Sequence, residues 1–400
     1  MREYIEAYFS WGTAALFLSA IVLLGFLMCR QAMKMNTAWI NRKYISVCFV
    51  LLIMSSLSSC RHPDVIPYLL KITSFADIEK YEYTPTHPQI ESSGNTAPAF
   101  IVIILGESFA PSHSSLYGYE KLTNPLLENK YEAGNLFIFN RVLSPGTRTA
   151  DVFRSLLNTY LTDTAMTRQW FNCTSLIEVM NTAGYHTFWL SNQEENGLIT
   201  NIPGGHSKIC DDAVFYRARY DGMLLDYEVP KTNERNAVFY HLWGQHYLFQ
   251  ERYPKEFDVF NPEDYKNSAK ENQRQTLAYY DNATLYNDFI VNSIIDRYKD
   301  SDAVVFYVPD HGLDMFDTDS GYCGHAMETP ESQAIARKIP FMIYLSPLYQ
   351  ELRPEITDRI KNATDRAFCT DRLIYAVMDA ASLRFLDNDE VEKYSLFRDL

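Results

Sequence analysis

Two carboxylates and a histidine of this 400-residue chain stand directly after apolar runs. Glu107 follows the run 100–105, and the adjacent pair Asp310 and His311 follows the run 303–309. Carboxylate and imidazole groups are ligands that Zn²⁺ takes in proteins. Each has an ordinary explanation when taken alone, because a glutamate after a strand often caps a helix and Asp-His is a common dipeptide. Their shared position after apolar runs favours a metal site.

Three histidines extend this pattern. His241 and His246 lie in HLWGQHY, at the end of another apolar run, and His325 lies in a loop before the last run. Taken alone, His325 would be interpreted as a solvated loop histidine. Together with the carboxylates, these side chains indicate one shared site at one edge of a predicted sheet.

A candidate nucleophile lies in the stretch SPGTRTADV. Thr147 and Thr149 follow its Pro-Gly turn and precede a helical segment that we expect to begin near Asp151. A helix N-terminus favours negative charge, and a hydroxyl that also coordinates zinc loses its proton and becomes a nucleophile at neutral pH. Without a metal, the simpler interpretation is that both threonines cap the helix.

Alternating strands and helices must position these residues. Runs rich in β-branched and aromatic residues predict strands at 100–105, 186–191, 236–244, 303–310 and 340–346. Amphipathic patterns predict helices at 175–183, 272–299 and 369–381. Ser175 and Glu178 are spaced as a capping box at the first of these helices. This alternation predicts an α/β fold with a mostly parallel sheet covered on both faces, in which ligands gather at the carboxyl ends of the strands.

The N-terminal sixty residues have the pattern of a membrane anchor. Residues 9–29 are uncharged and long enough as a helix to span roughly 30 Å of hydrocarbon, and a second uncharged run covers 44–60. The loop between them carries basic and no acidic residues, which places it in the cytoplasm and the rest of the chain outside the membrane. Alternatively, a start at Met35 makes this region a lipoprotein signal with Cys60 as the lipidated residue.

The remaining chain is predicted as a linker, 61–97, and an extracytoplasmic catalytic domain, 98–400. The net charge of −14 argues against a nucleic-acid partner, because a phosphate-binding surface needs an excess of Lys and Arg. The seven cysteines fit no zinc-finger or CxxC spacing. Four cysteines beyond residue 60 either form one or two disulfides or are buried thiols: Cys173, Cys210, Cys323 and Cys369.

Six ordered motifs resemble those of the phosphoethanolamine transferases, membrane-anchored members of the alkaline phosphatase superfamily. They are GESFAPSHSSLYGYEKLTNPLL (106–127), SPGTRTADV (144–152), AGYHTFWLSNQ (183–193), HLWGQHYLFQERYP (241–254), YYDNATLYNDFI (279–290) and VPDHG (308–312). The resemblance covers nearly all of residues 97–350. It implies an alkaline-phosphatase-like α/β/α sandwich with a mostly parallel central sheet, preceded by N-terminal transmembrane helices.

The resemblance also implies roles for individual residues. The family's zinc ligands match four positions of this chain: Glu107, Thr149, Asp310 and His311. Thr149 matches the nucleophile, with Thr147 as the fallback. His246 and His325 match histidines that bind the phosphoryl group or a second zinc, and Asn192 matches a polar residue near the substrate.

The implied reaction is a ping-pong transfer. Threonine attacks phosphatidylethanolamine and releases diacylglycerol, and a glycolipid acceptor such as lipid A or the lipopolysaccharide core then takes the phosphoethanolamine. Zinc, as one ion or two, and the histidines neutralise charge on the phosphoryl oxygens. The implied location is the bacterial inner membrane, with the catalytic domain in the periplasm.

This chain departs from the family pattern in three respects. It has two predicted spans where the family usually has about five, Pro145 where the better-known lipid A enzymes have Cys, and Leu313 where the family often has Glu. These departures leave the acceptor and the donor open. Two alternatives are a phosphoglycerol transferase of the lipoteichoic acid synthase type and an inactive, membrane-tethered binding domain. A formylglycine sulfatase is not indicated, because the chain has no CxPxR-like motif.

Overall fold

The computed structural model describes most of the region after residue 82. The described ranges are 83–92, 97–163, 169–195, 201–230, 234–325 and 329–398. The chain divides into two units, Met1–Ile78 and Glu79–Leu400, and the described residues belong to the second. The two predicted spans, Cys60 and most of the predicted linker lie outside them. Within these ranges, no helix combines the length and the apolar character needed to cross a membrane.

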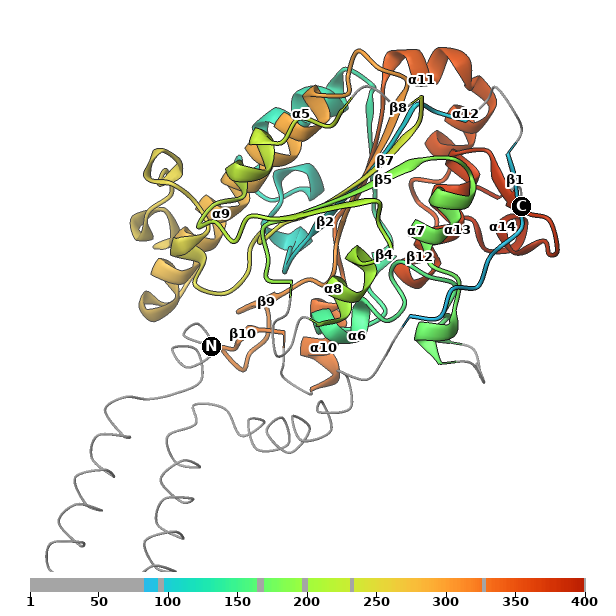
Figure 1. The fold of residues 1–400 in the computed structure, drawn as a ribbon. Coiled ribbons are helices and arrows are strands. Elements are labelled where there is room, and N and C mark those ends of the chain that lie inside the picture. Colours follow the sequence, from blue (N-terminus) through green and yellow to red (C-terminus); the bar gives the residue numbers. More distant parts are fainter. Residues whose placement is uncertain are drawn as a thin grey trace, which may run out of the picture. The chain divides into compact units, whose positions relative to one another are not determined.

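A seven-stranded mixed sheet forms the centre of the domain (Figure 1). Its strands stand in the order β3-β11-β8-β2-β7-β5-β6. Their bounds are Leu136–Phe139 (β3), Phe341–Leu345 (β11), Ala303–Pro309 (β8), Phe100–Gly106 (β2), Asn236–His241 (β7), His186–Ser191 (β5) and Asp212–Phe215 (β6). Four of the six pairings are parallel, and β11 runs antiparallel to both neighbours. The predicted α/β class is confirmed.

All five predicted strands belong to this sheet, whereas β3 and β6 were not predicted. Both unpredicted strands have only four residues and stand at the two edges of the sheet. An edge strand is paired on one side only and need not be a continuous apolar run. With four residues each, LFIF and DAVF, they are shorter than the runs that predict the other five strands.

Helices cover both faces of the sheet. Their bounds are Pro125–Glu132 (α5), Thr149–Val152 (α6), Leu176–Thr182 (α7), Asn201–Ser207 (α8), Glu271–Asp296 (α9), Pro330–Ala336 (α10), Pro347–Leu352 (α11), Pro354–Asn362 (α12), Leu373–Ala380 (α13) and Glu390–Tyr394 (α14). Helices α5 and α9 lie on one side of the sheet, and α7 and α13 lie on the other (Figure 1). The expected sandwich of helices around a sheet is therefore present.

The central strand β2 is apolar on both faces. Val102 and Ile104 belong to the buried cluster that also contains residues of α9 such as Tyr280. Side chains alternate along a strand, so Ile101 and Ile103 point to the other face, where they are also fully buried. No polar side chain interrupts this strand before its carboxyl end, where Glu107 follows.

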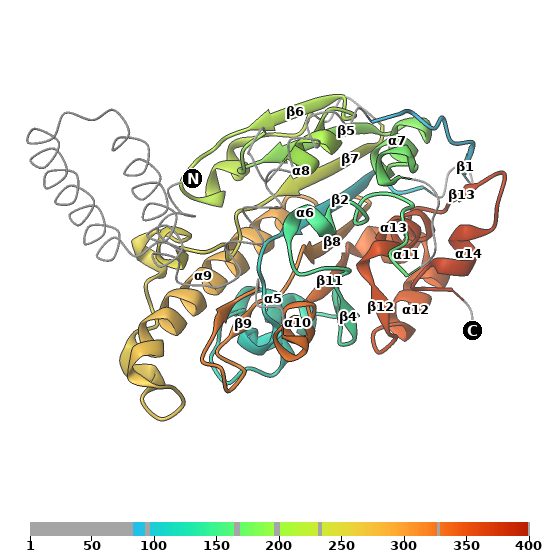
Figure 2. The ribbon, with the colours of Figure 1, turned by 90° about the horizontal axis from the view of Figure 1, so that it is seen from below.

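Three two-stranded sheets flank the central one. They pair β1 (Ile90–Ser92) with β13 (Leu383–Phe385), β9 (Asp314–Met315) with β10 (Cys323–Gly324), and β4 (Val142–Leu143) with β12 (Phe368–Cys369). The β9–β10 pair is antiparallel, and β9 lies beside α10 in both views (Figures 1 and 2). This pair matters for the site because His325 follows β10 directly.

Helix α7 corrects one local prediction. Ser175 caps the helix as expected, and its side chain accepts a hydrogen bond from the Ile177 amide. The expected capping box is wrong, however, because Glu178 accepts hydrogen bonds from the backbone amides of Thr86 and His87, both at 2.7 Å. The glutamate thus binds the segment that leads into the domain. All four cysteines of the described region are free thiols, as one of the two interpretations has it, but only Cys173 is buried and the other three are partly exposed.

Candidate metal centre and active site

The site is built on the carboxyl ends of two neighbouring parallel strands. The register of β2 and β8 pairs Gly106 with Pro309, so Glu107 and Asp310 leave the sheet side by side. A side chain at Gly106 would bring its Cβ within 2.6 Å of the Tyr307 hydroxyl oxygen. A larger residue where β2 reaches the site would therefore force the buried Tyr307 ring to shift.

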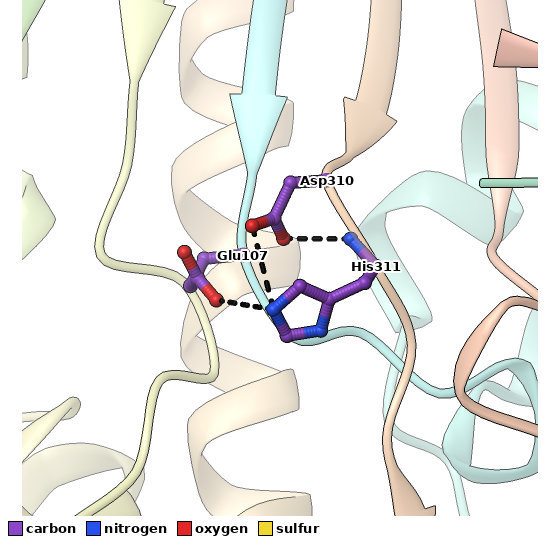
Figure 3. A group of neighbouring side chains, drawn as sticks. All are labelled: Glu107, Asp310 and His311. Carbon is purple, nitrogen blue, oxygen red and sulfur yellow. Dashed lines mark hydrogen bonds and ion pairs between the residues drawn. The ribbon is translucent and has the colours of Figure 1, made fainter. Parts of the chain in front are cut away.

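Glu107, Asp310 and His311 form a compact buried cluster (Figure 3). His311 Nε2 lies 3.3 Å from Glu107 Oε1 and 3.4 Å from Asp310 Oδ2. Each of the three side chains is at most 2% exposed, and one ligand atom from each lies within 4.8 Å of the others. Two carboxylates buried this closely repel each other unless a positive charge lies between them.

The donor set fits a zinc ion. His311 Nδ1 lies 2.8 Å from the Gly312 carbonyl oxygen, which can only accept, so Nδ1 carries the proton and Nε2 faces the carboxylates. Neither His311 Nε2 nor Asp310 Oδ2 has a hydrogen-bond partner among the described residues. Buried polar atoms are rarely left without a partner, and the carbonyl contact is the usual way of orienting a zinc-binding imidazole. The two atoms are thus available to a metal ion.

The pKa values of the three side chains indicate how the charges of the cluster are balanced without a metal. Burial, reinforced by the charge of Glu107, raises the pKa of Asp310 to about 7. Burial opposes the charged form of His311, but Asp310 and Glu107 outweigh it and raise the pKa of the imidazole to about 9. Burial also opposes the Glu107 carboxylate, yet the neighbouring His311 imidazole holds the pKa of this carboxyl well below the ordinary range. A proton on His311 therefore supplies the positive charge that a bound cation would supply.

Thr149 is the hydroxyl that meets the cluster. Its Oγ1 donates to Glu107 Oε2 over 3.3 Å, and its hydroxyl also stabilises the charged form of Asp310. It is the first residue of α6, so the helix begins two residues earlier than predicted and is a single turn. Thr147 contributes its backbone instead, because its carbonyl oxygen lies 2.6 Å from His325 Nδ1.

Two further predicted histidines lie near this cluster. The ring centroid of His325 is 4.2 Å from that of His311, and burial, with the neighbouring His311, lowers the pKa of His325 to about 3. His325 is therefore neutral, and its Nδ1–H donates a hydrogen bond to the Thr147 carbonyl oxygen. His246 follows β7, and its electrostatic interaction with Glu107 contributes to lowering the pKa of that carboxyl. His241, by contrast, is a core residue whose Nδ1 contacts the Ser191 hydroxyl at 3.1 Å.

Asn192 lies in a supporting network and has no recorded contact with the three-residue cluster. Its amide donates to Asp221 Oδ1 over 3.0 Å, and its oxygen accepts from the Ala218 amide at 2.7 Å. Asp221 also accepts the backbone amides of Trp243 and Gly244, both at 2.9 Å. Asn192 and Asp221 thus hold the loop that carries His246. Asp221 was missed by the sequence analysis, because it lies in a 3-10 helix, Asp221–Asp226, with no motif around it.

The same loop packs directly on the backbone of Glu107. Gly244 has φ +50, and a Cβ at this position would lie 3.0 Å from both the backbone nitrogen and oxygen of Glu107. The Gln245 amide donates to the Glu107 carbonyl over 3.1 Å. Because the loop approaches so closely, a change in it is transmitted to the cluster.

Fold and site together define a class of protein. The domain has an α/β fold, and two carboxylates, an imidazole and a hydroxyl lie together at the carboxyl ends of its parallel strands. This arrangement is typical of a metal-dependent enzyme that acts on charged esters. Comparison with protein families agrees, since the sulfatase family model matches residues 99–383. The chain belongs to the sulfatase family.

The predicted resemblance to the phosphoethanolamine transferases is confirmed. The chain is 28% identical over 314 residues to the phosphoethanolamine transferase EptC of Escherichia coli O18:K1:H7, a match that covers 74% of this chain and 52% of that protein. The chain thus spans about half the length of the curated relatives it matches.

Solved structures share the fold. The C-terminal periplasmic domain of EptC from Escherichia coli, in complex with Zn, superposes with a TM-score of 0.66 at 24% identity and covers 78% of this chain and 90% of its own. The integral membrane protein lipooligosaccharide phosphoethanolamine transferase A of Neisseria meningitidis gives a TM-score of 0.63 at 19% identity, covering 89% of this chain and 72% of its own.

Proposed function

We propose that this protein is a zinc-dependent phosphoethanolamine transferase that uses Thr149 as its nucleophile. The donor is phosphatidylethanolamine, and the acceptor is a glycolipid, either lipid A or the lipopolysaccharide core. The observation that carries the proposal is the contact of the Thr149 hydroxyl with Glu107, 3.3 Å long, at the edge of the buried cluster. The Zn in the EptC domain and the acceptor named for the Neisseria enzyme support it.

Four residues would hold the zinc ion: Glu107, Thr149, Asp310 and His311. Bound there, zinc lowers the pKa of the threonine hydroxyl and neutralises charge on the phosphoryl group. The chain's own contribution is to keep the site dry and oriented, because the two carboxylates and His311 are almost fully buried. We assign His246 and His325 to the non-bridging phosphoryl oxygens or to a second zinc ion. In its neutral form His325 offers the Nε2 lone pair to a metal, and it would bind a phosphoryl oxygen only with a proton on Nε2 as well.

The transfer proceeds in two displacements at phosphorus. In the first, the Thr149 oxygen forms a bond to phosphorus, the bond to the glycerol oxygen breaks, and diacylglycerol leaves with the proton that the threonine has lost. In the second, an acceptor hydroxyl oxygen bonds to phosphorus, the bond from phosphorus to Thr149 breaks, and the acceptor's proton passes to the Thr149 oxygen. The enzyme returns to its starting state with a free threonine hydroxyl.

The lipid donor and the glycolipid acceptor both require a site close to a membrane surface. The anchor predicted in residues 1–60 supplies this location, with the catalytic domain, predicted at 98–400, in the periplasm and the anchor in the bacterial inner membrane. The names of the structural relatives, an integral membrane protein and a periplasmic domain, support this assignment.

Intact-mass analysis of the full chain in detergent tests the proposal. After incubation with phosphatidylethanolamine and zinc, we expect the mass of one phosphoethanolamine group to be added and to map to Thr149. Thr149→Ala should take up no adduct, whereas Thr147→Ala, the matched control two residues away, should still form it. An adduct on Thr147 would refute the nucleophile assignment. A glycerol phosphate adduct from phosphatidylglycerol would move the protein to the lipoteichoic-acid-synthase type, and no adduct from either lipid would favour the inactive relative.

A further inference from the structure

Ser108, the residue after Glu107, has an unusual backbone conformation. Its φ is +54, in the left-handed region that a residue with a side chain rarely adopts. It is only 2% exposed, so the surrounding structure must impose this conformation. Such outliers are energetically costly and concentrate at functional sites. The conformation turns the chain sharply as it leaves β2, beside the proposed zinc ligands.

This turn lets Ser108 contact both carboxylates of the cluster. Its hydroxyl donates to Glu107 Oε1 over 2.7 Å, and its backbone amide donates to Asp310 Oδ1 over 3.2 Å. One oxygen of each carboxylate is thereby engaged. The other oxygens are Glu107 Oε2, which faces Thr149, and Asp310 Oδ2, which has no hydrogen-bond partner among the described residues.

Tyr280, from helix α9, holds this turn from the other side. Its hydroxyl donates to the Ser108 carbonyl oxygen over 2.7 Å and accepts the Ala110 amide at 2.8 Å. The ring is fully buried, so the hydroxyl has no alternative partner in water. The tyrosine therefore connects the longest helix of the domain to the residue that orients both carboxylates.

We propose that Ser108 and Tyr280 are positioning residues that make Glu107 and Asp310 bind zinc through one oxygen each. This inference rests on the proposed zinc site. A carboxylate whose first oxygen is already hydrogen-bonded is held against rotation and would bind a metal through the other oxygen alone. Zinc usually takes four ligands, so single oxygens from the two carboxylates would leave room for both His311 and Thr149.

Four variants of the full chain in detergent separate the hydroxyl from the backbone. Ser108→Ala removes the hydroxyl but keeps a side chain at positive φ, whereas Ser108→Gly removes the hydroxyl and relieves the backbone. Tyr280→Phe removes only the contact to the turn. Ser395→Ala is the matched control, because its hydroxyl also donates to a buried carboxylate, Asp379 Oδ2, at 2.6 Å, away from the site. Metal-free melting curves check that each variant is folded.

Two measurements that need no lipid give the result. Competition with a chelator should show zinc affinity roughly 10- to 100-fold weaker in both Ser108 variants, the usual effect of losing a partner that orients a ligand. Tyr280→Phe should also weaken the zinc affinity, and Ser395→Ala should leave the zinc affinity unchanged. In cobalt-substituted protein, the visible absorption should weaken in the Ser108 variants, because a carboxylate freed to bind through both oxygens raises the coordination number.

The outcomes distinguish this inference from the proposed function. Normal zinc affinity and an unchanged cobalt spectrum in Ser108→Gly would overturn the positioning role, even if Ser108→Ala were impaired, because only backbone strain would then be at work. Failure of the unaltered protein to bind zinc would instead refute the zinc site and with it the proposed function.

Discussion

Replacing Asp221 by Asn should destabilise the domain and reduce turnover without removing zinc. The Asp221 carboxylate accepts three hydrogen bonds: from the Asn192 side chain at 3.0 Å, and from the backbone amides of Trp243 and Gly244 at 2.9 Å. An asparagine oxygen in place of Oδ1 keeps the first two. It loses the bond to Gly244, and its amide group then faces that N–H.

The magnitude follows from this loss. A hydrogen bond to a charged acceptor contributes roughly 1.5–3 kcal/mol, and a buried donor left unsatisfied costs roughly 1–3 kcal/mol. Burial raises the pKa of Asp221, which means that keeping this carboxylate charged is itself costly. Replacing it by a neutral amide removes that cost and therefore offsets part of the lost stability. We therefore expect a net destabilisation of about 2 kcal/mol and a melting temperature lower by roughly 4 °C.

The assay combines thermal melting, zinc content and kcat/KM for the transfer. Zinc content should be unchanged, because Asp221 contacts no predicted ligand, while kcat/KM should fall because the loop with His246 shifts. Asp226→Asn is the matched control, since Asp226 is exposed and lies in the same 3-10 helix, and it should change nothing. If Asp221→Asn melts and turns over like the unaltered protein, this carboxylate does not hold the loop.

Other changes probe the cluster and the core. Asp310→Asn should weaken zinc binding by at least about 10-fold, measured by chelator competition, and unchanged affinity would count against Asp310 as a ligand. Gly244→Ala should cost about 2 kcal/mol in thermal unfolding, because φ is +50 and the added Cβ lies 3.0 Å from the Glu107 backbone; equal stability would show that the loop can retreat. Burial raises the pKa of Asp288 from 3.8 to about 7, so the folded state binds that proton more tightly than the unfolded state, and this stabilisation is lost as pH rises from about 4 to 7. Melting from pH 4 to 8 should therefore show Asp288→Asn gaining stability relative to the unaltered protein as pH rises, and parallel curves would contradict the raised pKa.

The strand-end positions of the cluster were predictable because apolar runs are local signals. Each buried run that forms β2, β7 or β8 is continuous in the sequence, and the first polar residues after it must lie where the strand leaves the sheet. Glu107, Asp310 and His311 could therefore be placed at one edge before their distances were known. The edge strands β3 and β6 were missed because each has only four residues.

The supporting residues were not predictable from spacing. Asn192 was predicted to lie near the substrate, and that role stays a prediction; its hydrogen bonds with Asp221 and with the Ala218 amide were not predicted. Glu178 has the spacing of a capping box in the sequence, yet its carboxylate accepts hydrogen bonds from the Thr86 and His87 amides instead. Both side chains bind partners from segments distant in the sequence, and no local sequence pattern predicts such contacts.

The sequence by itself determined the α/β class, the order of the central strands along the chain and the residue types at their ends, because hydrophobic periodicity and turn residues act over a few positions. Tertiary structure alone decided which threonine meets Glu107, that Ser108 turns at positive φ to contact both carboxylates, and that Tyr280 and Asp221 hold the surrounding loops. These features depend on the register between β2 and β8 and on the packing of α9. The contacts involved join residues up to 202 positions apart, so their energies are set only when the chain is folded.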